Sequence, residues 1–143
     1  MNGNAELLNY VYQNSQMGVE TIRHLIEICE DEEFDRRMES EFDEYSEIHK
    51  EAKRLLNENG FDEKGISALS KVKTYLMLNM QTMNDKSPSH LSEMLIIGSN
   101  MGVIDAVKNL KKYPRAEPKI THLMQRLLRF EENNIQELKN FLS

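Results

Sequence analysis

The chain has 143 residues, with 39% hydrophobic and 29% charged side chains, which is the size and composition of one globular domain over residues 1–143. Its net charge of −6 argues against general nucleic-acid or anionic-membrane binding, and no apolar run approaches the roughly 20 residues of a membrane span. The single cysteine, Cys29, excludes an internal disulfide and a Cys-rich metal cluster, and the absence of a signal-peptide pattern in the first residues predicts a cytoplasmic protein.

Chain breakers divide the sequence into helices, and the low counts of 6 glycines and 3 prolines favour an all-α fold. Asn4 is a candidate cap for a first helix that runs to about residue 30. Asp31 is the candidate cap of a second helix, and Asn59-Gly60 supplies a left-handed stop after residue 58. A shorter helical pattern covers residues 66–83.

Ser87-Pro88 has the pattern of a cap and first residue for another helix, which continues to about Lys112. The last predicted helix covers about residues 118–142. Four of the five segments have about 25 residues, or about 38 Å at 1.5 Å per residue. Short connections predict two antiparallel hairpins, and the long connection between them allows the second and third long helices to run parallel. The pattern predicts a four-helix bundle with a long helical crossover, and a five-helix array is the alternative.

The third long helix differs from the others because apolar residues nearly encircle it. A helix of this kind is buried on several sides, so we expect either the short helix or a second subunit to cover its outer face. Gly98, Gly102 and Ala106 share one of its faces. Two interior glycines cost about 2 kcal/mol relative to alanine, which predicts that a tight helix crossing compensates for them.

Several polar residues fall on the apolar faces, where an unpaired polar group costs about 1–3 kcal/mol. They lie on the second, third and last long helices: Glu41, Tyr45, His49, Asp105, Glu131 and Asn134. Three carboxylates that face one interior repel each other unless they are protonated, paired or bridged by a cation. These residues are therefore the candidate site, as a hydrogen-bonded cluster or as a metal site.

Crossover connectivity with inward carboxylates resembles the ferritin-like superfamily, and the layout is similar to that of its small bacterial members. The halves of the chain also look weakly repeated, since Met17-Gly18-Val19 recurs as Met101-Gly102-Val103, and Glu41-Phe42 has a reversed counterpart in Phe130-Glu131. Di-iron members of that superfamily use Glu and Glu-x-x-His ligands on successive helices. This chain departs from the pattern, because Glu131-x-x-Asn134 has asparagine in the place of histidine and Glu20 is predicted to face water.

The incomplete ligand set predicts a non-enzymatic ferritin-like bundle that acts through protein contacts. We expect a homodimer, without a cofactor and without nucleic-acid or membrane partners; the sequence does not identify another protein partner. The alternative is a metal-binding bundle that holds Fe, Mn or Zn. Its ligands would be Glu41, Asp105 and Glu131, with Asn134 or His49 assisting. His49 alone is more typical of a core histidine than of a ligand.

Three further features each have a structural and a functional interpretation. Met77, Met80 and Met83 repeat every third residue, and thioethers bind copper(I), but we expect Met80 and Met83 to fill gaps in the core. Cys29 falls in an apolar stripe and is predicted to be an inert small hydrophobe. His24-x-x-Glu27 places two potential ligands on one exposed helix face, which is too few for a zinc site.

Overall fold

A computed structural model describes residues 2–62 and 70–143, with Ser70 described by its backbone alone. The described residues form helices joined by loops and contain no strand, so the all-α prediction is confirmed. The elements are α1 (Asn4–Ile28), α2 (Glu32–Glu58), α3 (Ser70–Thr82), α4 (Pro88–Lys112) and α5 (Pro118–Leu138), followed by the short 3₁₀ turn η2 (Lys139–Phe141).

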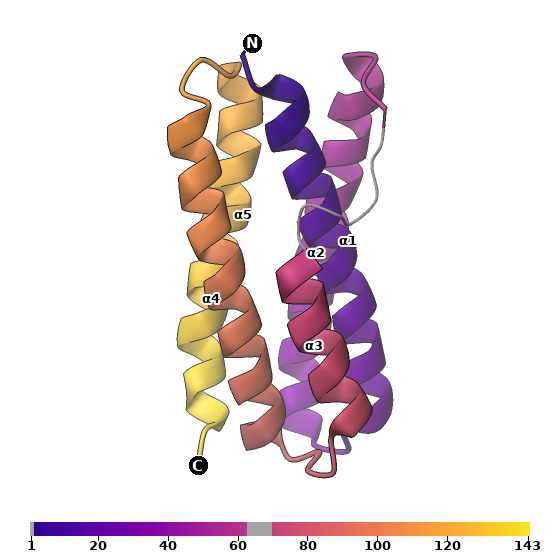
Figure 1. Ribbon diagram of the computed structural model, residues 1–143. Helices are drawn as coiled ribbons and strands as arrows, with labels where there is room; N and C mark the ends of the chain where they lie inside the picture. Colours follow the sequence, from indigo (N-terminus) through magenta and orange to yellow (C-terminus); the bar gives the residue numbers. More distant parts are fainter. Residues whose placement is uncertain (1, 63–69) are drawn as a thin grey trace.

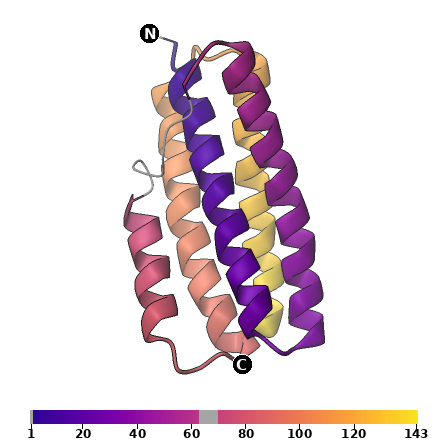
Figure 2. The ribbon, with the colours of Figure 1, turned by 90° about the vertical axis from the view of Figure 1, so that its right-hand side faces the viewer.

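The four long helices lie side by side, and α3 lies along the outside of the molecule (Figure 1). α1 and α2 form one antiparallel hairpin, and α4 and α5 form the other. α2 and α4 point in the same direction, as the long connection between them allows (Figure 2). α3 packs against α4 and runs parallel to α1, so it covers part of the side that α1 and α4 share.

The helix ends largely follow the predicted capping residues. The Asp31 carboxylate accepts a hydrogen bond from the Phe34 amide at 2.8 Å, and the Ser87 hydroxyl accepts one from the His90 amide at 3.2 Å. Gly60 has a φ of 71°, the left-handed conformation that ends a helix without the steric cost of a Cβ atom. Local sequence therefore sets the ends of α2 and the start of α4.

Asn4 was wrongly predicted as the cap of the first helix, because α1 begins at Asn4 itself, after Gly3 with a φ of 84°. The Asn4 amide donates instead to the Asn2 side chain at 2.9 Å. The buried Asn4 side chain accepts from the Glu117 amide at 2.9 Å, which ties the start of α1 to the start of α5. A tertiary contact has therefore taken the side chain that the local pattern assigned to capping.

The other helix boundaries lie close to the predicted ones. α1 ends two residues before position 30, and the last helix turns into η2 before residue 142. Of the predicted helix 66–83, residues 70–82 are helical, and positions 66–69 lie outside the described residues.

One hydrophobic core runs through the described helices, and Glu20 faces water as predicted. α4 is only partly covered by its neighbours: Ile97 and Ile104 are 40% and 54% exposed. Along the described parts of the chain, every helix is too short or too polar to span a bilayer.

Candidate functional site

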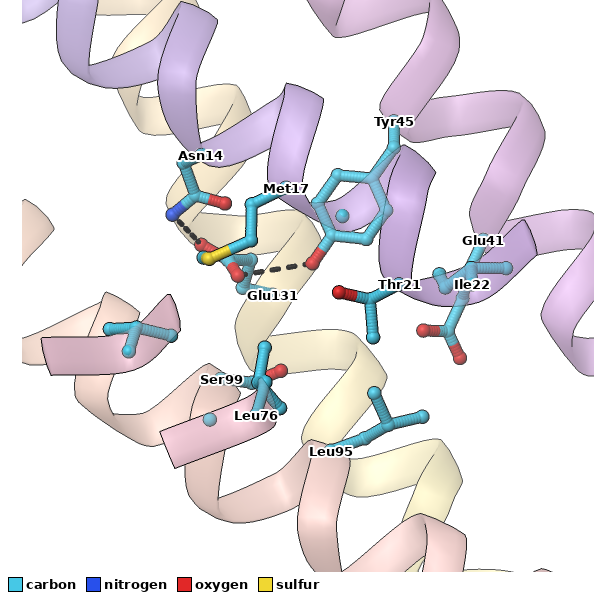
Figure 3. Close-up of a pocket in the computed structure, with 13 residues that line it drawn as sticks. Asn14, Met17, Thr21, Ile22, Glu41, Tyr45, Leu76, Leu95, Ser99 and Glu131 are labelled. Carbon is cyan, nitrogen blue, oxygen red and sulfur yellow. Dashed lines mark hydrogen bonds between the residues drawn. The ribbon is translucent and has the colours of Figure 1, made fainter. Parts of the chain in front are cut away.

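A small cavity of about 30 Å³ with both polar and apolar lining residues lies between the helices (Figure 3). This volume holds one or two water molecules or a small ion, because one water needs about 10–15 Å³ on this measure. Polar side chains from four helices line the cavity, and α3 closes it with apolar side chains. The polar lining residues are Asn14 and Thr21 of α1, Glu41 and Tyr45 of α2, Ser99 of α4 and Glu131 of α5.

Glu131 is held by neutral donors from two other helices. The Tyr45 hydroxyl donates to one carboxylate oxygen at 3.1 Å, and the Asn14 amide donates to the other at 3.0 Å (Figure 3). Burial raises the pKa of Glu131 to about 7, because desolvation of the charged form outweighs the two hydrogen bonds. Glu131 thus links α5 to α1 and α2.

Glu41 is held by a cation from its own helix. The Arg37 guanidinium donates to the Glu41 carboxylate at 3.2 Å and to the Asn134 side-chain oxygen at 2.8 Å. Burial still raises the pKa of Glu41 to about 7, because desolvation outweighs the attraction of Arg37. This second network joins α2 to α5.

The two carboxylates act on each other electrostatically. The negative charge of Glu41 raises the pKa of Glu131, so the first deprotonation makes the second less favourable. With pKa values of about 7, both carboxyl groups exchange protons near neutral pH. The cavity walls therefore gain and lose negative charge in the physiological pH range.

The tyrosines around the cavity stay protonated. Burial and the nearby Glu131 charge raise the pKa of both Tyr10 and Tyr45 far above the ordinary value for a phenol. Tyr10 donates to the Gly102 carbonyl oxygen at 2.7 Å, and this bond joins α1 to α4. Both phenols are therefore hydrogen-bond donors and not catalytic bases.

The glycines of the two Met-Gly-Val segments lie beside side chains that line the cavity, although Gly18 alone of the two belongs to the lining. A Cβ atom at Gly18 would lie 2.7 Å from the Tyr45 ring. A Cβ atom at Gly102 would lie 3.3 Å from the Asn14 amide nitrogen and 3.4 Å from the Glu131 carboxylate. The sequence predicted a tight helix crossing at the glycines of α4. The atoms nearest to these glycines belong instead to side chains of other helices, such as Leu76 beside Gly98.

Four of the six predicted site residues belong to one region. Glu41 and Glu131 line the cavity, and Asn134 joins Glu41 through Arg37. The buried Asn134 amide nitrogen has no hydrogen-bond partner among the described residues. Tyr45, which was predicted to join a hydrogen-bonded cluster with these residues, does so through Glu131.

Asp105 and His49 lie apart from the cavity lining. Asp105 is half-buried on α4, and its charge contributes a small rise in the pKa of Tyr10. The His49 ring stacks on Tyr12 with centroids 4.5 Å apart, and its Nδ1 lies 3.2 Å from the Ser15 hydroxyl. His49 is therefore a half-buried histidine that packs against α1.

The arrangement limits which metal chemistry the site can perform. In the stretches 2–62 and 70–143, no three His, Cys, Asp or Glu side chains converge in a way that could hold a metal ion. Two of the three predicted carboxylates meet at the cavity, and the remaining side-chain oxygens of its lining belong to the neutral residues Asn14, Thr21, Tyr45 and Ser99.

Sequence reasoning missed Asn14, Tyr10 and Arg37, which supply most of the polar contacts. Asn14 and Tyr10 lie on the flank of the apolar stripe of α1, and they are buried because α1 contacts α2, α4 and α5. Apolar periodicity marks only the centre of such a wide buried arc. Arg37 was detectable, because it lies four residues before the inward Glu41, the spacing of a helical ion pair.

Comparison of the chain with family models, curated proteins and solved structures found no match. The function must therefore be argued from the residues of this chain.

Proposed function

We propose that the protein is a non-enzymatic, ferritin-like helical bundle that works by self-association, as a homodimer formed through the outward face of α4. Two paired hairpins, a parallel α2 and α4, and inward carboxylates at mid-height support the ferritin-like architecture. The carboxylates already have protein partners, since Arg37 contacts Glu41, and Tyr45 and Asn14 contact Glu131. Such a network aligns the helices without a bound metal.

The observation that carries this proposal is the exposed stripe of α4. Its members recur every three or four residues along one side of the helix: Glu93, Ile97, Asn100, Ile104 and Lys108. Both isoleucines are at least 40% exposed. Half-buried Ile96, Met101, Val103 and Val107 flank the stripe and widen its apolar surface. This spacing is that of a helix seam that packs against a second helix.

A second copy of the chain fits this stripe when the two α4 helices run antiparallel around a twofold axis between Asn100 and Met101. In that register Ile97 of one copy meets Ile104 of the other, so each exposed isoleucine gains an apolar partner. Glu93 meets Lys108 of the other copy, and opposite charges attract across the interface rim. A parallel pairing would instead bring the two copies of Lys108 together, so charge favours the antiparallel twofold dimer.

Sedimentation equilibrium of the full chain tests the dimer. We expect a concentration-dependent dimer in the wild type and a monomer in Ile97→Lys/Ile104→Lys, because lysines in the seam place like charges against each other. Glu132→Lys on the exposed face of α5 is the matched control and should still dimerise. A monomeric wild-type protein at all concentrations would rule out the proposal.

A charge exchange tests the register. Glu93→Lys and Lys108→Glu should each weaken the dimer, and the double variant Glu93→Lys/Lys108→Glu should restore it, because it re-forms both cross-pairs with reversed signs. If the double variant is no stronger than the single ones, the antiparallel register is wrong even where the dimer persists.

A second candidate function is divalent cation binding at the cavity. It is favoured by the small cavity between two buried carboxylates, because carboxylate oxygens are ligands that hard divalent cations prefer. An all-oxygen set of carboxylates and hydroxyls suits Mn²⁺ better than Zn²⁺, and Fe remains the metal that the ferritin-like resemblance implies. Glu41 and Glu131 would hold the ion, and Tyr45 and Thr21 would complete its surroundings.

Elemental analysis of tag-free protein, grown with added Fe, Mn and Zn, tests this second function. Metal binding predicts about one or two equivalents that are lost in Glu41→Gln/Glu131→Gln, in line with the one or two ions of carboxylate sites in such bundles. Glu39→Gln/Glu132→Gln removes two exposed carboxylates from the same helices and should keep the metal. A metal-free wild-type protein would exclude the cation site and leave the self-association proposal intact.

A further inference from the structure

A surface hollow of about 300 Å³ lies between α1 and α3 and shares no lining residue with the carboxylate cavity. Its lining residues are His24 of α1 with Met77, Met80 and Gln81 of α3. An adjoining hollow of about 290 Å³ shares Met77 and Met80 and is also lined by Met17. The parallel course of α1 and α3 brings these residues together from segments more than 50 positions apart (Figures 1 and 2).

Core packing alone does not explain the exposure of Met77 on α3. Val72 and Leu76 are the α3 side chains that point inward, and they are 2% and 6% exposed. Met77 is 42% exposed, although a thioether side chain is apolar. Met80 is half-buried and packs against the core, as does Met83 beyond it. α3 therefore leaves one methionine 42% exposed beside a second, half-buried methionine and an exposed histidine.

The donor chemistry of the hollow differs from that of the cavity. Thioether sulfur is a soft ligand that selects copper(I), and imidazole nitrogen also binds copper. Met77 and Met80 are three residues apart and share one face of α3, so both sulfurs can reach the same ion. His24 lies on the facing side of α1 and adds a third donor.

We propose that this hollow is a copper(I) site in which the sulfurs of Met77 and Met80 and one ring nitrogen of His24 bind the ion. The site is independent of the self-association surface, because the stripe of α4 contributes no residue to it. No redox step is involved, since the metal is bound and released as copper(I).

Anaerobic titration of the full chain with copper(I) in competition with bicinchoninate tests the site. We expect the wild type to withdraw one equivalent of copper from the chelator. Met77→Leu/Met80→Leu should weaken binding at least tenfold. Loss of an outer-shell partner of a metal site already weakens binding by about tenfold, and these two residues are direct ligands in the proposed site. Leucine nearly conserves the volume of methionine, so α3 keeps its packing. Helical circular dichroism and thermal melting of each variant check this.

Two controls make the result specific. Met83→Leu removes the next methionine of the same repeat, which does not line the hollow, and should leave the affinity unchanged. Cys29→Ala removes the thiol of the chain and should also leave it unchanged, since Cys29 is buried and burial raises the pKa of its thiol. Loss of binding in Cys29→Ala, or equal affinity of wild type and Met77→Leu/Met80→Leu, would overturn the proposal, as would failure of the wild type to compete.

Silver(I) provides a second readout that does not depend on chelator competition. With methyl-labelled methionine, we expect Ag⁺ to shift the methyl signals of Met77 and Met80 and to leave that of buried Met38 in place. His24→Gln should weaken the response without abolishing it. Shifts spread evenly over all methionines would show nonspecific binding and contradict the site.

Discussion

The two carboxylates of the cavity provide a comparison within one structure. Glu41 and Glu131 are each 3% exposed, and burial raises the pKa of each to about 7. Their partners differ in kind: Glu131 receives two neutral donors from α1 and α2, whereas Glu41 receives a guanidinium from its own helix. Burial therefore raises the pKa of both carboxyl groups, whether the partner is charged or neutral.

The partial exposure of Arg37 explains why its positive charge does not keep the pKa of Glu41 low. The Arg37 side chain is 22% exposed, so water screens its attraction for the carboxylate. Desolvation of a carboxylate in the interior is a larger effect, and it dominates at both positions. Both carboxyl groups therefore carry an unfavourable charge in the folded protein at alkaline pH, and the donors around them mainly fix their orientation.

The largest expected effect is the dependence of stability on pH. Both carboxyl groups have a folded-state pKa above the ordinary value of 4.5, so the native state binds more protons than the unfolded state between pH 4.5 and 7. The stabilising contribution of these two groups is therefore full below about pH 4.5 and is lost as the pH rises through 7, by up to about 3 kcal/mol for each carboxyl group. Urea unfolding at pH 5 and pH 8 measures this loss.

Amide variants assign the loss to one carboxyl group. Glu131→Gln should reduce the loss of stability between pH 5 and pH 8 by about half, because the amide remains uncharged at both pH values. Glu41→Gln should do the same. Glu132→Gln changes an exposed neighbour and should retain the full loss. An unchanged difference between pH 5 and pH 8 in Glu131→Gln would show that its charge is not unfavourable in the folded state.

Arg37→Met should produce the next largest effect. It leaves the Glu41 carboxylate without its cation and the Asn134 side-chain oxygen without its donor. Removing one partner of a buried pair costs about 3–5 kcal/mol, and the partial exposure of Arg37 lowers this to about 2–3 kcal/mol at pH 8. The cost should be smaller at pH 5, where Glu41 is protonated. Arg36→Met, on the exposed side of the same turn, is the control for urea unfolding; equal losses in both variants would contradict the pairing.

More of the fold than of the candidate site could be predicted from the sequence. Helix ends follow local chemistry, so Asp31, Gly60 and Ser87 were sufficient to locate them. The inward positions of Glu41 and Glu131 followed from helical periodicity in the same way. The start of α1 failed because Asn4 bonds across the molecule to Glu117, a contact that no local pattern contains.

The partners of the carboxylates depend on distances between helices, which periodicity does not give. Asp105 shares a helix face with residues that do line the site, yet it lies beyond them and is half-buried. Asn14 lies beside Glu131 because Gly102 leaves space for both. Assigning these residues requires the packing of α1 against α4 and α5, which a single sequence does not specify.

Gly18 and Gly102 differ in how easily their neighbours can move to accommodate an added methyl group. Gly18→Ala should destabilise the fold by about 1–2 kcal/mol, because overpacking by a methyl group outweighs the gain of about 1 kcal/mol in helix propensity. The Tyr45 ring in its way packs edge-on against Phe130 and cannot withdraw. Gly102→Ala meets flexible polar groups at 3.3–3.5 Å, and its net effect should be close to zero. Thermal melts of the two variants decide this, and equal losses would contradict the distinction.

Tyr45→Phe should have a small effect on stability and the clearest effect on Glu131. The variant keeps the ring beside Phe130 and removes only the hydroxyl that donates to the carboxylate. The loss of one hydrogen bond costs about 1 kcal/mol, and more at pH 8, where the acceptor is charged. Because the Tyr45 hydrogen bond lowers the pKa of Glu131, its removal should raise that pKa above about 7. Carbon NMR of the Glu131 carboxyl group follows this titration, while Glu41, bonded to Arg37, should change little. An unchanged Glu131 titration would mean that the neutral donors do not influence the pKa of Glu131. The partners of Glu41 and Glu131 would then differ in geometry alone.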